Sequence, residues 1–279
     1  MSPPPILTDD HALMRHRHRA RRQTGHADAM FLHHMALTDL QERLTEVNRT
    51  FTNPAVVSGF PEIWRDAFSK ARLIEDRETL DLTPEAHDLV IHAMGLHWAN
   101  DPLGQLVQCR RALRPDGLFL GVLPGGRSLH ELRASLAEAE VRITGGLSPR
   151  VLPMGEIRDL GALLQRAGFA LPVADGFTQT ATYPTLQALM GDLRAMGEVN
   201  ALAARLKRFT ARQVFSQAAE IYAEGYGGPD GRIPATFELI CLTGWAPHGS
   251  QQAPLRPGSA RQRLADVLCV PERQLPDGG

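Results

Sequence analysis

Three side chains with acid–base or ion-pairing chemistry follow two apolar runs of the chain. His97 comes after the run at 88–93, and Glu131 and Arg133 come after the run at 117–123. Imidazoles exchange protons near neutral pH, and guanidinium groups bind carboxylates through two parallel hydrogen bonds. The three residues are therefore candidates for catalysis or for binding a peptide. Structural roles are the alternative, in which His97 caps a turn and Glu131 closes the first turn of a helix.

Other signatures of catalysis are missing from the sequence. It contains no HExxH, GxSxG or GxxxxGK[ST] motif, so zinc-protease, serine-hydrolase and P-loop functions have no support. Cys109, Cys241 and Cys269 are far apart and show no CxxC spacing, so neither a disulfide framework nor a zinc site is expected. We expect no metal site, although the sequence leaves open a site of two histidines and a carboxylate built across the fold.

A strand–helix–strand unit within residues 87–126 positions these side chains. Residues 88–93 form a short β-branched run, residues 103–113 carry apolar side chains at helical spacing, and residues 117–123 form a second apolar run after a Pro/Gly turn. Strands and helices alternate along the rest of the chain, which predicts an α/β fold with a mostly parallel sheet and helices on both faces. Ligands bind such sheets beyond the carboxyl ends of the strands, so the turns after these strands should frame a pocket.

The patterns divide the chain into three parts. We expect an N-terminal helical cap over 1–52, an α/β domain over 53–246 with a helical insertion at about 185–226, and an extended tail over 247–279 that could include a short helix at 260–268. A helix closed by Ser128 and Glu131 is expected after the strand at 117–123.

The N-terminal part contains a basic run. Residues 11–26 hold five arginines and few acids, which would suit a transit peptide, an anionic partner or an RNA contact. We favour a solvated helix face, because the run continues into a helical apolar stripe at 30–51. The whole chain carries 30 Lys and Arg against 31 Asp and Glu, so nucleic acid is not an expected partner. No apolar run is long enough to span a bilayer and the start does not look like a signal peptide, so a cytoplasmic protein is expected.

The strand–helix–strand unit resembles the second half of a class I S-adenosylmethionine (SAM) methyltransferase domain. The words DLV, LHW and LRPDG, at 88–90, 96–98 and 113–117, carry this resemblance. Over about 5–268 the chain is similar to methyltransferase-like proteins of the complex I assembly-factor type, on segments such as EVNRTF, LMGDLRAMGEVNAL and AAEIYAEGY. It is less similar to the malonyl-carrier-protein methyltransferases of biotin synthesis.

The resemblance implies a Rossmann-like fold with SAM as cofactor. For eukaryotic relatives it implies a role in assembling NADH:quinone oxidoreductase (complex I), including hydroxylation of an arginine on a core subunit. The implied partner is a protein substrate or client, such as a subunit of the peripheral arm of complex I. The residues at the implied cofactor positions are Ser58, Gly59, Glu75, Asp76, Ala93, Met94, His97 and Trp98.

The loop after the first strand departs from the glycine-rich GxGxG pattern of that superfamily. Glycines let the backbone approach the methionine portion of the cofactor, but here the loop reads Ser58-Gly59-Phe60-Pro61-Glu62. We expect Phe60 to project bulk into or beside the pocket. Pro61 lacks an N–H and should begin a helix over 61–70.

The first half of the sheet also looks short. Only 32 residues separate Val57 from Val90, whereas three crossovers with two intermediate strands need roughly 45. At least one strand and helix should therefore be missing or reduced. The run at 71–76 is the expected second strand, which would place Glu75 or Asp76 where a carboxylate binds the cofactor ribose; an ordinary turn is the alternative.

These observations leave two functions open. One is an enzyme of the SAM-dependent methyltransferase superfamily, which could modify a protein arginine. The other is a non-catalytic assembly factor that has lost SAM binding and holds a partner protein with its helical insertion.

Overall fold

A computed structural model describes residues 6–252 of the chain. The chain divides into two compact units after Pro247, and the first unit contains every helix and strand given below. Most of the predicted tail, including the helix expected at 260–268, lies outside the described residues.

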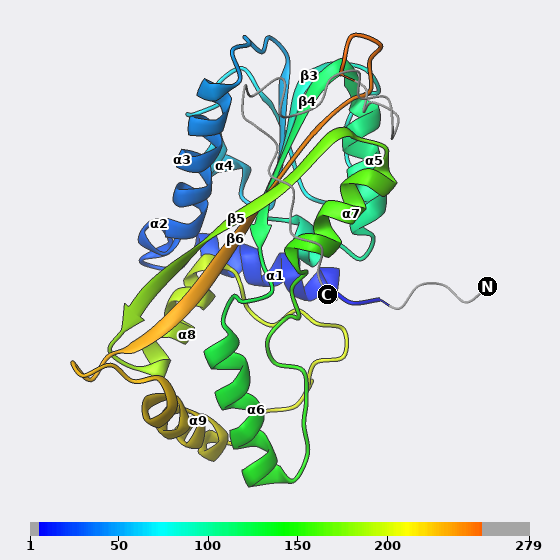
Figure 1. The fold of residues 1–279 in the computed structure, drawn as a ribbon. Helices are drawn as coiled ribbons and strands as arrows, with labels where there is room; N and C mark the ends of the chain where they lie inside the picture. The colour runs from blue at the N-terminus through cyan, green and yellow to red at the C-terminus, as the bar shows by residue number, and fades with distance from the viewer. Residues whose placement is uncertain (1–5, 253–279) are drawn as a thin grey trace, which may run out of the picture. The chain divides into compact units, whose positions relative to one another are not determined.

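The described part of the first unit is built around one six-stranded sheet (Figure 1). The strand order is β2-β1-β3-β4-β6-β5; the first four of these strands run parallel, whereas β6 pairs antiparallel with both β4 and β5. The strands are β1 (Pro54–Ser58), β2 (Arg72–Ile74), β3 (His87–Ala93), β4 (Leu113–Pro124), β5 (Ala170–Tyr183) and β6 (Ile233–Trp245). The predicted α/β fold with a mostly parallel sheet is confirmed.

Each face of the sheet is covered by its own hydrophobic core. Neighbouring residues of a strand point to opposite faces, so Val56 joins one core and Val57 joins the other. The second core includes residues of α5 (Pro102–Ala112) and α7 (Ile157–Ala167). The larger first core includes residues of α3 (Phe31–Glu46), α4 (Pro61–Trp64), α6 (His130–Thr144), α8 (Leu186–Met196) and α9 (Arg212–Tyr226).

The predicted strand–helix–strand unit corresponds to β3, α5 and β4. Asp101 begins α5 by accepting a hydrogen bond from the N–H of Gly104 at 2.8 Å, and Pro102 occupies the first helical turn, where a missing N–H costs nothing. The Pro/Gly segment predicted as a turn lies inside β4. Its bend is absorbed there by Asp116, whose φ of 62° is left-handed, and by a shift in the pairing with β3.

The shortened first half is confirmed as well. The helix expected over 61–70 is only the four residues of α4, because the chain turns back before it reaches β2. Between β2 and β3 the structure has neither helix nor strand. The edge of the sheet therefore ends at a three-residue strand.

The N-terminal segment forms α1 (Asp10–Arg21) and α2 (His26–Ala29) ahead of α3. α1 lies across the end of the sheet at which β3 and β4 finish (Figure 1). Two hydrogen bonds with residues distant in the sequence hold the start of α1 in place. The N–H of Asp9 donates to Ala201 O at 2.7 Å, and Arg205 donates to the Asp9 carboxylate at 2.8 Å.

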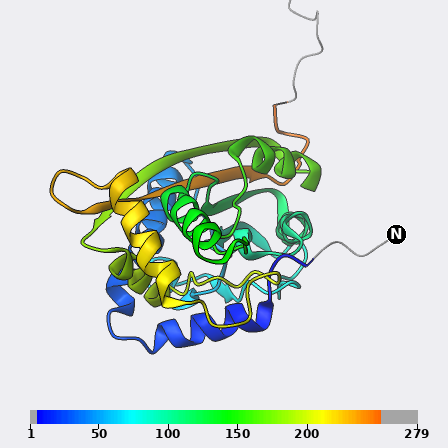
Figure 2. The ribbon, with the colours of Figure 1, turned by 90° about the horizontal axis from the view of Figure 1, so that it is seen from below.

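β5 and β6 are the longest strands, and they extend beyond the others toward α8 and α9 (Figure 1). The helical insertion, α8 and α9, connects these two strands, as predicted. α6 and α9 lie side by side when the molecule is seen from below (Figure 2). No helix among the described residues is long and apolar enough to span a membrane.

Candidate functional site

A cavity of about 360 Å³ lies between α1 and the ends of β2 and β3. We call it the strand-end cavity. It sits where the sequence predicted a pocket, at the carboxyl ends of parallel strands. Its lining comes from α1, from the segment after β2, from the segment after β3 and from α5: Asp10, Leu13, Met14, Arg17, Asp76, Arg77, Glu78, Thr79, Gly95, Trp98, Ala99, Asn100 and Gln105.

A buried ion pair forms one wall of this cavity. Arg17 of α1 donates to both carboxylate oxygens of Asp76, from Nη1 at 2.6 Å and from Nη2 at 2.9 Å, and the two side chains are 2% and 5% exposed. Asp76 follows β2, at the position expected to bind a cofactor ribose. Both of its oxygens therefore already have a donor.

The guanidinium of Arg17 also packs directly against the loop that replaces the glycine-rich motif. A Cβ added to Gly59 would collide with the guanidinium carbon of Arg17. Ser58 is fully buried and its Oγ accepts the N–H of Phe60 at 3.2 Å, while Pro61 has no N–H to offer. The resemblance assigns this loop to the methionine portion of the cofactor, and the guanidinium of Arg17 occupies the space beside it. The residues present do not fit this portion of SAM.

Phe60 does not line the strand-end cavity, so the expectation that it projects into the pocket is wrong; it lies beside the pocket, with the guanidinium of Arg17 5.9 Å from the centroid of its ring. Its ring is buried in the larger core, 5.5 Å from the ring of His26 and 5.4 Å from that of His33, with the guanidinium of Arg21 4.8 Å from its centroid. Phe60 turns this way because α1, α2 and α3 provide an aromatic and cationic pocket for its ring.

The other expected cofactor positions differ in accessibility. Glu75 is exposed and pairs with Arg77, whereas Ala93 and Met94 are buried. Met94 has a left-handed φ of 52°, and its N–H donates to Val122 O at 2.8 Å. The turn continues into Gly95, which packs closely against the Asp76 carboxylate.

His97 and Trp98 converge on a residue from the helical insertion, Glu198. Trp98 Nε1 donates to Glu198 Oε2 at 2.8 Å, and His97 Nε2 lies 3.2 Å from the same oxygen. The alternative that His97 caps a turn is therefore wrong. Asn100 accepts the N–H groups of Leu7 and Thr8 with its side-chain oxygen.

Burial disfavours a charge on Glu198, but its interactions with His97, with the guanidinium of Arg17 and with the N–H of Trp98 outweigh this effect. The pKa of Glu198 consequently falls below its ordinary value, so this carboxylate is ionised at neutral pH.

Glu131 and Arg133 lie elsewhere. Glu131 is buried and binds the hydroxyl and N–H of Thr236 on β6, so it does not close a cap with Ser128 as the spacing predicted. Ser128 itself exchanges hydrogen bonds with the backbone of Glu238. Arg133 approaches Ser128 O and Leu152 O, each at 3.4 Å. The structure does not bring either residue to His97, and neither lines the strand-end cavity.

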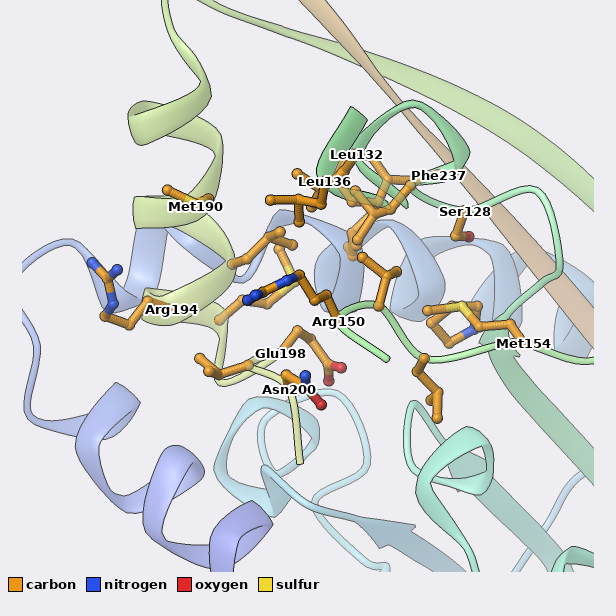
Figure 3. A pocket seen from close by; sticks show the side chains of 18 of the residues that line it. Ser128, Leu132, Leu136, Arg150, Met154, Met190, Arg194, Glu198, Asn200 and Phe237 are labelled. Atoms are coloured by element: carbon orange, nitrogen blue, oxygen red, sulfur yellow. The ribbon is translucent and has the colours of Figure 1, made fainter. Parts of the chain in front are cut away.

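A second cavity of about 270 Å³ is bounded by α6, α8, α9 and the segment 150–154; we call it the apolar pocket (Figure 3). Its walls are mostly aliphatic or aromatic side chains, among them Leu132, Leu136, Met190, Phe215 and Phe237. Trp98 borders both this pocket and the strand-end cavity. Within the described residues, no group of three or more His, Cys, Asp or Glu is placed to hold a metal ion.

Two residues of these cavities were missed from the sequence, Arg17 and Glu198. Each acts through a partner about sixty or a hundred positions away, which no local pattern shows. A signal did exist for Arg17. It stands four residues after Leu13 and three before Ala20, on the buried stripe of α1, so the solvated-face interpretation of the basic run is wrong for this arginine.

Comparisons with known proteins agree with this architecture. Residues 42–121 match the family described as "Methyltransferase domain". A solved structure of a methyltransferase-type protein from Bacillus halodurans C-125 shares the fold with a TM-score of 0.50 at 13% identity, and the match covers 76% of this chain and 100% of that one. The chain has a class I methyltransferase fold.

Proteins of two different names are among those similar to this methyltransferase-fold chain. "Arginine-hydroxylase NDUFAF5, mitochondrial" of Danio rerio is 40% identical over 202 residues, which are 72% of this chain and 63% of the relative. The human protein of that name is 40% identical over 195 residues, 70% and 56% of the two chains. "Malonyl-[acyl-carrier protein] O-methyltransferase" of Xylella fastidiosa (strain M23) is 34% identical over 206 residues, 74% and 65%. The resemblance inferred from the sequence is confirmed.

Two further facts come from these relatives. The chain spans about three fifths of the length of the arginine-hydroxylases that it matches. Their names assign them to mitochondria, which contradicts the cytoplasmic location expected from the sequence.

Proposed function

We propose that this methyltransferase-fold protein is a non-catalytic assembly factor that holds a protein client in the assembly of respiratory complex I. The proposal of a protein client rests on the resemblance to the complex I assembly-factor type and on the relatives named arginine-hydroxylase NDUFAF5. From the name of these relatives we also expect that the client presents an arginine to this chain.

One observation supports the non-catalytic part of the proposal. Arg17 fills the space beside Gly59 and donates to both oxygens of Asp76, the two residues that the resemblance assigns to the methionine portion and the ribose of SAM. SAM carries a sulfonium cation, and a guanidinium within the same site would repel it.

Titration with SAM tests this part. A ligand that binds only the folded state raises its stability by RT ln(1 + [L]/Kd), about 2.7 kcal/mol at a hundredfold excess over Kd. We expect no change in the thermal midpoint of the full chain at millimolar SAM. A midpoint that rises with SAM concentration would refute the loss of the cofactor site.

A SAM-dependent methyltransferase is the second candidate. It is favoured by the strand-end cavity itself and by Asp76 at the ribose position. This candidate requires Arg17 to leave Asp76. It predicts that the midpoint of the wild-type chain rises with SAM concentration, and a wild-type midpoint that stays constant at millimolar SAM excludes it.

Binding of the client is tested with purified core subunits of the peripheral arm of complex I. The full chain, used as bait, should retain one of them, and Met190→Asp should weaken retention because it places a charge in the apolar pocket. Val141→Asp is the matched control, since Val141 is half exposed on α6 outside the pocket. No retention of any subunit by the wild-type chain would contradict the assembly role.

A further inference from the structure

The apolar pocket contains one acidic side chain, and it comes from the turn that ends α8. Glu198 follows Gly197, whose left-handed φ of 85° ends the helix; the N–H of Gly197 returns to Arg194 O and that of Glu198 to Leu193 O. A Cβ on Gly197 would come within 2.8 Å of the Phe60 ring. The end of α8 and the Phe60 ring therefore determine the position of Glu198.

The carboxylate of Glu198 has one oxygen committed and one open. The contacts with Trp98 and His97 both converge on Oε2, and no residue that the structure describes donates to Oε1. The side chain is 13% exposed, so water reaches it only in part. An ionised carboxylate with an unfilled acceptor, surrounded by apolar walls, is a strong binding site for a cation.

The two arginines that also line the pocket do not fill this role. Arg150 donates to both oxygens of Glu140, at 2.8 and 2.7 Å, so the charges of these two buried side chains compensate each other. Arg194 is exposed on α8, and Figure 3 shows its guanidinium pointing away from the labelled apolar side chains. The negative charge of Glu198 thus faces the pocket without a cation from Arg150 or Arg194 opposite it.

We propose that Glu198 is the specificity-determining residue of the apolar pocket and that it binds the guanidinium of an arginine side chain presented by the client. The three methylenes of the arginine would lie along the leucine and methionine walls, and the guanidinium would donate to Glu198 Oε1. A guanidinium is less strongly hydrated than an ammonium and stacks on aromatic faces, and Trp98 borders the pocket beside Glu198. These properties favour arginine over lysine at this position.

The inference rests on the proposed function, but small probes test it without the client. We would measure binding of n-butylguanidinium to the full chain by calorimetry and compare it with n-butylurea, a neutral molecule of nearly the same shape. The guanidinium should bind at least about tenfold more tightly than the urea, as expected for a charge-assisted hydrogen bond. It should also bind more tightly than n-butylammonium. Equal affinities for the guanidinium and the urea, or for the guanidinium and the ammonium, would overturn the proposal.

Variants then locate the contact. Glu198→Gln keeps the shape of the side chain and an oxygen that can accept from Trp98, but removes the charge, so it should lower butylguanidinium affinity about tenfold or more and leave butylurea unchanged. Glu138→Gln, on the exposed face of α6, is the matched control and should change neither affinity. Unchanged guanidinium binding in a folded Glu198→Gln protein would show that the contact is wrong. If this variant does not fold, the comparison of the probes on the wild-type chain still decides.

The outcomes for the probes and for the client are separable. If the complex I subunits bind but Glu198→Gln retains them and butylguanidinium as well as wild type does, the pocket assignment fails and the client role stands. If no subunit binds while butylguanidinium binds in a Glu198-dependent manner, the pocket assignment stands and the client role fails.

Discussion

Arg17 and Asp76 connect the N-terminal helix to the end of β2 through two hydrogen bonds of 2.6 and 2.9 Å inside the protein. Removing one partner of such a pair leaves a buried charge without compensation. The pair therefore couples the presence of α1 to the integrity of the strand-end cavity.

Asp76→Ala should reduce the free energy of unfolding by about 3–5 kcal/mol, because Arg17 would remain buried and unpaired. Arg17→Met combined with Asp76→Leu should lose less than the Asp76→Ala variant, because no isolated charge remains. Urea denaturation measures both. Arg72→Ala is the control: its partner Asp81 is 88% exposed, so stability should change little. A loss for Asp76→Ala no larger than for Arg72→Ala would contradict the buried pair.

Phe60→Ala should destabilise the protein without creating SAM binding. The ring is 1% exposed and packs against two histidines, so its removal should cost about 3–5 kcal/mol. The strand-end cavity gains no space because Arg17, not Phe60, lies against Gly59. Denaturation and a SAM titration of the same variant test the two statements, and a folded Phe60→Ala protein that binds SAM would show that Phe60 blocks the site.

Substitutions at two glycines that end helices should distinguish the stability cost of backbone strain from that of a side-chain contact. Gly145 after α6 and Gly197 after α8 both have left-handed φ, 69° and 85°. Of the two, only Gly197 has neighbours within 4 Å of an added Cβ, and the nearest is the Phe60 ring at 2.8 Å. Gly145→Ala should cost about 1–2 kcal/mol from backbone strain alone. Gly197→Ala should cost more, since the ring must also shift, and should weaken butylguanidinium binding. Equal losses of stability would mean that the contact with Phe60 contributes nothing.

Stability should fall in mild acid because of His33. This imidazole is 1% exposed, and burial, aided by the nearby charge of Arg17, lowers its pKa from 6.5 to about 3. Between those pH values the unfolded chain binds a proton that the folded protein excludes, so stability is lost as pH falls below 6.5, by up to about 1.4 kcal/mol per pH unit. The slope of unfolding free energy against pH should flatten in His33→Phe. The exposed neighbour His34 provides the control substitution His34→Phe, which should leave the slope unchanged.

Local sequence patterns predicted most of the sheet. The apolar runs of β1, β3 and β4 and the stripe of α5 are periodic over their own length, so each element could be recognised without its neighbours. The missing unit followed from chain length alone, since 32 residues between Val57 and Val90 do not accommodate the full set of crossovers.

The site could not be predicted as well, because its contacts join distant segments. The direction of the Phe60 ring depends on His26 and His33, and the partner of Asp76 comes from a helix that composition alone describes as solvated. Glu131 matches a helix-capping pattern in the sequence, but its carboxylate accepts a hydrogen bond from Thr236 on the last strand. In each case tertiary packing decided among several locally acceptable partners.

Trp98 borders both cavities, so its indole is a partition that the two share. A molecule that displaced this ring from one side would change the room available on the other. Thermodynamic linkage then requires reciprocity: whatever factor an occupant of the strand-end cavity applies to affinity in the apolar pocket, an occupant of that pocket applies in return.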